Sequence, residues 1–204
     1  GIGEHKAVSL KNGARVDLNT DTRVAWKEGS DARLWLERGE IALSVPAGTA
    51  LTVHAAGEVV LIGGADVIIR LRNHTMDAVV VTGQLLIGRS MVTPSANDVV
   101  TTGEGVLIGA GERRVRTLTP KEIQFVSAWR QNELIFEGQT LAVAVEEYNR
   151  YLTNKIVIVD QELAAIQIGG RFKSRDPADF LDTMDSSFGI HVSRDASGSV
   201  MLSR

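Results

Sequence analysis

The sequence contains no cysteine, which excludes disulfide scaffolds, thiolate metal sites and cysteine nucleophiles. It has no run of about 18 apolar residues, so no segment is predicted to cross a membrane as a helix. A basic excess of the kind found on nucleic-acid-binding domains is also missing, because the formal net charge is −3. What is present is a hydrophobic content of 44%, which is enough for a globular protein to bury a core.

The acidic surplus lies in one part of the chain. Up to Phe125 there are 14 Lys and Arg against 14 Asp and Glu, whereas from Val126 onward there are 8 against 11. The only basic run is Arg113-Arg114-Val115-Arg116, which we interpret as the solvated face of an edge strand rather than as a phosphate-binding patch. With 204 residues, the chain has room for one large domain or two small ones.

Up to about residue 125, short apolar stretches rich in Val, Ile and Thr alternate with turn signals, roughly every ten residues. Asn12-Gly13 is a strong hairpin signal, because a type I′ turn needs positive φ at both central residues. The alternation of the segment 33–45 is interrupted around Gly39, where we expect a tight turn or a bulge. The pattern predicts an all-β domain over residues 1–125, either a sandwich or a solenoid-like stack.

The period then changes from strand to helix. After a junction expected at residues 113–128, a strand is predicted at 132–138, and Leu141, Val145, Tyr148 and Leu152 follow at the spacing of one helical face. Further strands are expected at 154–160 and around 165–172. We predict a small α+β domain over residues 126–204 with split βαβ repeats.

A second helix is predicted between residues 176 and 189. Asp176 suits the N-cap position, Pro177 the first helical position, and Gly189 the residue after the last turn. The expected buried stripe of this helix is Phe180, Leu181, Met184 and Phe188. A closing hairpin turns at residues 195–198.

No residue pattern indicates catalysis, a cofactor or a metal. The four histidines have no metal-site spacing; they are His5, His54, His74 and His191. The glycine-rich segment 101–112 fails as a phosphate loop, because Ile108 stands where the third glycine is needed. The clustered carboxylates are interpreted as solvated helix faces; they are Glu146, Glu147, Asp176, Asp179 and Asp182. The chain is therefore predicted not to be an enzyme.

Several short patterns together resemble one family. The first comprises Leu10, Gly13, Val16, Leu18 and Asn19. The second comprises Leu36, Gly39, Glu40, Leu43 and Val45. The third comprises Leu61, Ile62, Gly63 and Val67. Later matches are Trp129, Leu134, Phe136, Leu141, Val145, Arg150, Tyr151, Ile168, Gly170 and Phe172. This set is similar to the periplasmic domain of FecR-type anti-sigma regulators of siderophore cell-surface signalling.

The last 75 or so residues also resemble the small N-terminal module of secretins and TonB-dependent proteins, which is built from two βαβ halves. The resemblance implies the periplasmic portion of a single-pass inner-membrane protein. Its implied partners are the N-terminal signalling domain of a TonB-dependent outer-membrane siderophore transducer and, through a segment absent from this chain, an extracytoplasmic-function sigma factor. No nucleic acid, small-molecule substrate or cofactor is implied, and the fragment is expected to be a monomer. Because the chain starts Gly-Ile-Gly, an upstream segment is expected.

Two surfaces for the partner follow from these expectations. One is a cleft between the two domains, with Tyr151, Gly170, Arg171 and Phe172 as predicted contacts. The other is an exposed edge strand of the C-terminal domain, extended by β-augmentation. Tyr148 and Tyr151 lie three residues apart, so that one is expected in the core and the other outside as an interface anchor. The rival functions are a periplasmic assembly module without signalling and, more remotely, a polysaccharide-acting enzyme on a β-solenoid.

Overall fold

The computed structural model describes residues 1–27, 29, 32–88 and 98–204. They form two compact units: an N-terminal unit, His5–Val126, and a C-terminal unit, Ser127–Arg204 together with Gly1–Glu4. Within the described ranges no helix is both long enough and apolar enough to cross a membrane. That residues 1–125 and 126–204 fold as separate domains stays a prediction.

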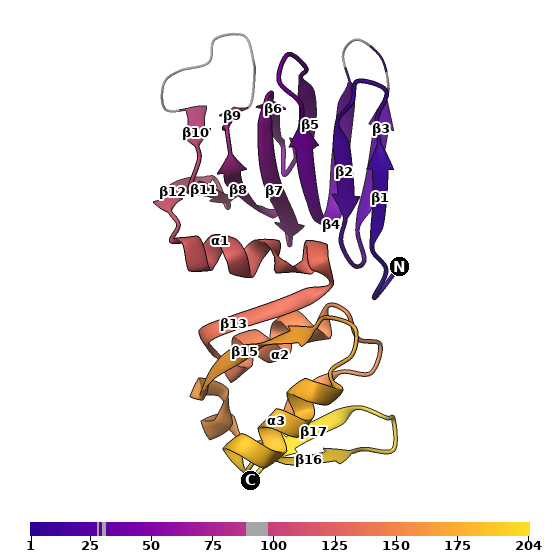
Figure 1. The fold of residues 1–204 in the computed structure, drawn as a ribbon, viewed down its shortest axis with the longest axis vertical. Coiled ribbons are helices and arrows are strands. Elements are labelled where there is room, and N and C mark those ends of the chain that lie inside the picture. The colour runs from indigo at the N-terminus through magenta and orange to yellow at the C-terminus, as the bar shows by residue number, and fades with distance from the viewer. Residues whose placement is uncertain (28, 30–31, 89–97) are drawn as a thin grey trace. The chain divides into compact units, whose positions relative to one another are not determined.

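The N-terminal unit is built from twelve paired strands (Figure 1). They are β1 (Lys6–Ser9), β2 (Arg15–Leu18), β3 (Arg23–Lys27), β4 (Arg33–Val45), β5 (Leu51–Ala55), β6 (Glu58–Ile62), β7 (Ala65–Arg72), β8 (Thr75–Thr82), β9 (Gln84–Gly88), β10 (Val99–Thr101), β11 (Glu104–Gly109) and β12 (Glu112–Thr117). Helix α1 (Pro120–Ser127) follows the last strand.

The long strand β4 belongs to two parts of the sheet. Its first part pairs with β3 and, in parallel, with β5, and β6, β9 and β10 continue from there. Its second part pairs with β2 and β7, and β8, β11 and β12 continue on that side. Both parts face one core, in which Leu34 and Val53 meet Ile41 and Ile69, each no more than 1% exposed. The all-β prediction is confirmed, as one continuous sheet folded over a single core.

Strand β4 changes partners at Gly39 and Glu40. Gly39 has a φ of +93°, a conformation that residues with a side chain rarely adopt. Glu40 is only 3% exposed, and its carboxylate accepts a 2.7 Å hydrogen bond from the Asn19 side chain. Thr22 Oγ1 donates to the Glu40 carbonyl at 3.0 Å and accepts from the Glu40 N–H at 2.9 Å. These bonds satisfy backbone groups that a bend would otherwise leave unpaired.

The C-terminal unit consists of two small sheets and two α-helices. Its elements are η2 (Ala128–Gln131), β13 (Glu133–Thr140), α2 (Leu141–Asn149), β14 (Ile156–Ile158), η3 (Gln161–Ala165), β15 (Gln167–Lys173), α3 (Ala178–Phe188), β16 (His191–Arg194) and β17 (Val200–Ser203). Strands β13 and β15 form one antiparallel sheet, and the other has the order β14-β17-β16. Helix α2 contacts β13 and β14 while α3 contacts β15 and β16, so the helices lie between the sheets (Figure 1). The α+β prediction is confirmed.

The helix boundaries follow from local capping. Thr140 accepts a hydrogen bond from the Val143 N–H at 3.4 Å and so starts α2. Asp176 Oδ1 accepts one from the Ala178 N–H at 3.2 Å, but α3 begins at Ala178 with Pro177 as its N-cap, one residue later than predicted. Gly189, with a φ of +63°, ends α3 in the left-handed conformation that glycine adopts without strain.

An aromatic cluster fills the space around the two helices. Phe180 lies at its centre, with its ring centroid 4.6 Å from Tyr148, 5.4 Å from Phe172 and 6.4 Å from Phe136. Phe136, Tyr148 and Phe180 are at most 1% exposed. The side chains come from β13, α2, β15 and α3, so one cluster joins the β13-β15 sheet to both helices.

Phe188, Glu147 and the strand predicted around 165–172 are placed differently from the sequence-based prediction. Phe188, predicted in the buried stripe of the second helix, is 37% exposed because it is the last residue of α3. Glu147, predicted on a solvated face, is buried and forms a 2.7 Å ion pair with Arg150. The strand predicted around 165–172 begins only at Gln167, because η3 occupies the residues before it.

Tyr148 provides a test of the cluster. No group among the described residues hydrogen-bonds its buried hydroxyl, and burial, with the charges of Asp179 and Asp176, raises the pKa of this phenol. Because the folded pKa lies above the unfolded value of about 10, stability from the neutral phenol is present below pH 10 and is lost as the pH rises further. We expect Tyr148→Phe to raise the free energy of unfolding at pH 7 by about 1 kcal/mol, because it removes a buried hydroxyl without a hydrogen bond. It should also abolish the loss of stability above pH 10.

The measurement is denaturant unfolding at pH 7 and above pH 10. Tyr151→Phe is the matched control, since it leaves Tyr148 in place and should keep the alkaline loss. Equal alkaline loss in the wild type and in Tyr148→Phe would show that another group controls it.

Candidate partner-binding surface

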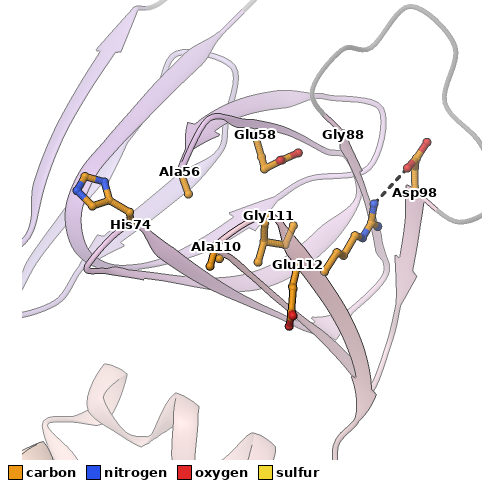
Figure 2. Close-up of a pocket in the computed structure, with 11 residues that line it drawn as sticks. Ala56, Glu58, His74, Gly88, Asp98, Ala110, Gly111 and Glu112 are labelled. Atoms are coloured by element: carbon orange, nitrogen blue, oxygen red, sulfur yellow. Dashed lines mark hydrogen bonds and ion pairs between the residues drawn. The ribbon is translucent and has the colours of Figure 1, made fainter.

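A polar pocket of about 300 Å³ lies where the β5–β6, β7–β8 and β11–β12 turns of the N-terminal unit come together (Figure 2). Arg113 Nη1 lies 3.1 Å from Asp98 Oδ1 and donates to the Ile87 carbonyl at 3.3 Å. Glu58 and Glu112 add two carboxylates to the lining. With three carboxylates against one guanidinium, the pocket is poorly suited to an acidic ligand.

The pocket has no recognisable catalytic arrangement either. In the described part of the chain, no group of three or more His, Cys, Asp or Glu is placed to hold a metal ion. We therefore assign Arg113 a structural role, in which it ties β12 to β9 and to the start of β10. The basic run does lie on an edge strand, as predicted, because β11 is the one strand that pairs with β12 within the described ranges. Two further arginines of the run form ion pairs, Arg114 with Glu112 and Arg116 with Asp77.

The four partner-binding residues predicted from the sequence fall into two classes. Tyr151 is 6% and Phe172 is 8% exposed, which corrects the expectation that Tyr151 faces outward. Phe172 is drawn inward by the aromatic cluster, and Tyr151 packs inward just beyond the end of α2. Gly170 and Arg171 are exposed on β15, and Arg171 forms a 2.6 Å ion pair with Glu133 on β13.

Gly170 has a packing role of its own. A Cβ at this position would lie 2.7 Å from the Phe172 ring, so glycine is needed for that ring to reach the cluster. Of the four residues, only the Arg171 side chain thus offers a substantial accessible group. The cleft between the two domains stays a prediction.

A different surface of the C-terminal unit has free backbone groups. Among the residues that the structure describes, strand β14 pairs on one side only, in parallel with β17. The Lys155 carbonyl accepts from the Val200 N–H at 2.8 Å, and the Val159 N–H donates to the Leu202 carbonyl at 2.9 Å. Because successive residues of a strand alternate in direction, the N–H and C=O groups of Ile156 and Ile158 point to the opposite side, away from β17.

These two outward-pointing residues have different environments. The Ile156 N–H donates to Asn149 Oδ1, and Asn149 Nδ2 donates to the Ile156 carbonyl, both at 2.8 Å. Among the described residues, no hydrogen bond joins the outward N–H or C=O of Ile158 to another group. Half of the β14 edge is thus covered by one amide side chain, and the other half is open.

A groove of about 480 Å³ runs beside this edge, between α2 and β14, with η3 closing part of it. The helical wall is formed by Ala142, Val145, Glu146 and Asn149, which lie at i, i+3, i+4 and i+7 on one face of α2. Ala164 of η3 adds to the apolar lining. We refer to these residues and residues 155–158 as the β14 groove.

Comparisons with known proteins bear on the whole chain. Residues 1–86 match the family described as FecR protein. Two crystal structures of a candidate anti-sigma factor from Parabacteroides distasonis ATCC 8503 are similar to this chain, with TM-scores of 0.75 and 0.74. In both, the sequence identity is 20%, and the likeness covers 100% of this chain and 96% of the other. No curated protein matches the chain.

The two kinds of match carry different information. At 20% identity, the structural likeness shows a shared fold across both units. The family match concerns the sequence of the N-terminal unit, where the Leu18-Asn19 and Gly39-Glu40 patterns lie. The resemblance predicted from the sequence is therefore confirmed: residues 1–86 form a FecR-type region.

Proposed function

We propose that this chain is the sensor portion of an anti-sigma regulator of the FecR type. The observation that carries the proposal is the family match over residues 1–86, and the fold shared with a candidate anti-sigma factor supports it. In this proposal, the chain lies in the periplasm as part of an inner-membrane protein. It binds the signalling domain of a TonB-dependent siderophore transducer and relays the signal to an extracytoplasmic-function sigma factor.

The C-terminal unit is the part that we assign to the transducer. Its elements form two halves, β13-α2-β14 and β15-α3-β16, in which each helix contacts the strands on either side of it. This arrangement supports the resemblance to the secretin and TonB N-terminal module. The partner implied by the family is itself a module of that type, so the contact would join two related modules.

Such a sensor needs no catalytic group. Nor does it need a metal ion, and among the described residues no group of three or more His, Cys, Asp or Glu is placed to hold one. What the sensor requires is a surface whose binding free energy differs between two states of the regulator, because a ligand shifts an equilibrium only by that difference. Binding of the transducer then changes the stability or the accessibility of the regulator, and the sigma factor is released or activated as a result.

We expect isothermal titration of the chain with the cognate signalling domain to give a Kd between roughly micromolar and nanomolar, as for interfaces of standard size. The signalling domain of a transducer for an unrelated ligand is the control and should bind much more weakly. If neither heat nor co-elution is observed with the cognate domain, the proposed function is wrong.

The rival function, a periplasmic assembly module, has one observation in its favour. An open sheet edge such as that of β14 is also a surface on which copies of one chain can pair into a larger assembly. Light scattering at increasing protein concentration separates the two functions. The sensor function predicts a monomer that forms a one-to-one complex with the signalling domain, whereas the assembly function predicts oligomers without any partner.

A further inference from the structure

We propose that the β14 groove binds an extended segment of the transducer's signalling domain, which adds to β14 as a fourth strand of the β14-β17-β16 sheet. The identity of the partner rests on the proposed function, whereas the mode of binding rests on the groove itself. The proposed contact surface is therefore on the β14-β17-β16 sheet, and not at the exposed residues Gly170 and Arg171 of β15 that were predicted from the sequence.

The backbone of β14 specifies an extended peptide as the occupant. The outward N–H and C=O of Ile158 form a donor and acceptor pair without a partner among the described residues. The outward N–H and C=O of Ile156, two residues earlier on the strand, form a second donor and acceptor pair, which Asn149 occupies. Only a chain in extended conformation offers complementary groups at that spacing, because the groups of a helix are used internally.

The Asn149 side chain already occupies one of these positions as a peptide mimic. A carboxamide carries the same N–H donor and C=O acceptor as a peptide unit. From α2, Asn149 makes with Ile156 the two bonds that an incoming strand would make, both at 2.8 Å. In the free protein this side chain protects half of the edge, a common way to prevent unwanted strand pairing. An incoming strand pairs first with Ile158 and then displaces Asn149.

The groove provides contacts for side chains as well as for the backbone. Residues of an added strand alternate, so that every second side chain points toward α2. There it meets Ala142 and Val145, and Ala164 closes the lining from η3. Binding between an edge strand and a flanking helix combines main-chain hydrogen bonds for affinity with side-chain pockets for specificity.

A second copy of this chain is a poorer occupant. Pairing β14 with β14 would require two Asn149 side chains to be displaced at once, each with two hydrogen bonds to lose. A partner strand whose edge is not covered by a side chain requires the displacement of only one Asn149 side chain. For this reason we assign the groove to the partner protein.

The test replaces Ile158 with proline in the full chain. Proline replaces the half-buried isoleucine side chain, removes the outward N–H without touching a hydrogen bond to β17, and places its ring on the open side, a substitution that edge strands tolerate. We expect Ile158→Pro to weaken binding of the cognate signalling domain at least 100-fold in isothermal titration. The thermal unfolding temperature should change little. Arg171→Ala, on β15, is the matched control and should bind within about twofold of the wild type.

Two further measurements do not depend on the proline variant. In the wild-type complex, exchange of the Ile158 amide hydrogen with solvent should slow at least tenfold, as seen by NMR. Asn149→Ala removes the competing amide and should strengthen binding about 30-fold, the factor that corresponds to the two hydrogen bonds of about 1 kcal/mol each that no longer have to be displaced.

The outcomes separate this inference from the function on which it rests. If the signalling domain binds and Arg171→Ala loses binding while Ile158→Pro does not, β15 is the surface and the inference is wrong. Binding with unchanged exchange at Ile158 also overturns it. A wild-type dimer that Ile158→Pro dissociates would make a second copy the occupant. If the wild type does not bind the domain at all, the proposed function itself fails.

Discussion

Replacing Gly39 with alanine is expected to destabilise the N-terminal unit by about 4 kcal/mol, which is a large fraction of the roughly 5–15 kcal/mol by which domains are ordinarily stable. Two effects add. Alanine at a φ of +93° is strained, and the new Cβ would lie 2.5 Å from the Cα of Thr22 as well as against its side chain. A clash with backbone can be relieved only by moving β4, and that would break the Thr22–Glu40 hydrogen bonds.

Gly57→Ala is the matched control for this variant. Gly57 also has a positive φ, +79°, but nothing lies within 4 Å of the Cβ that alanine would add. It should therefore cost only the conformational strain, about 1 kcal/mol. Denaturant unfolding compares the two variants, and hydrogen exchange shows whether the loss is confined to the N-terminal unit. Similar unfolding free energies for both variants would mean that the contact with Thr22 does not control the bend.

The Gly39-Glu40 pattern also shows what could be predicted from the sequence. Alternation around Gly39 indicated a turn or bulge, and the structure has a bend there. The partners that make the bend necessary, Asn19 and Thr22, are about twenty residues away, and a one-dimensional pattern contains no information on that pairing. The family patterns thus mark the bend, while its physical reason becomes visible only in three dimensions.

Helix α1 was missed although its start signal is in the sequence. Thr119 and Glu122 form a capping box in which the Glu122 carboxylate accepts from the Thr119 N–H at 2.7 Å and Thr119 Oγ1 accepts from the Glu122 N–H at 3.3 Å. Pro120 occupies the first helical position, where proline is favoured. The helix has no fully buried residue, so the apolar periodicity by which helices are usually found is weak.

The candidate site was the least predictable part. Aromatic residues near the end of a helix suggested an interface, yet Tyr151 and Phe172 are buried because a unit of this size needs its large side chains for the core. Conversely, nothing in the sequence singles out Asn149. Its role depends on α2 being placed beside the outward edge of β14, which is a property of tertiary packing.

The second large effect is expected from Phe180→Ala, which should destabilise the C-terminal unit by about 3–5 kcal/mol. Phe180 is fully buried and contacts Phe136, Tyr148 and Phe172, so its removal leaves a cavity between both helices and the β13-β15 sheet. Phe188→Ala on the same helix is the matched control: the side chain is 37% exposed, and its loss should cost less than about 1 kcal/mol.

Urea unfolding followed by hydrogen exchange distinguishes the two phenylalanine variants. In Phe180→Ala, amides of α2, α3 and β15 should exchange much faster, while those of β7 and β8 should keep their protection. Accelerated exchange in both units would show that the two units unfold together, in which case the aromatic cluster stabilises the whole chain. A loss of stability no larger than that of Phe188→Ala would show that the cavity collapses and that the cluster is not what holds the β13-β15 sheet and the two helices together.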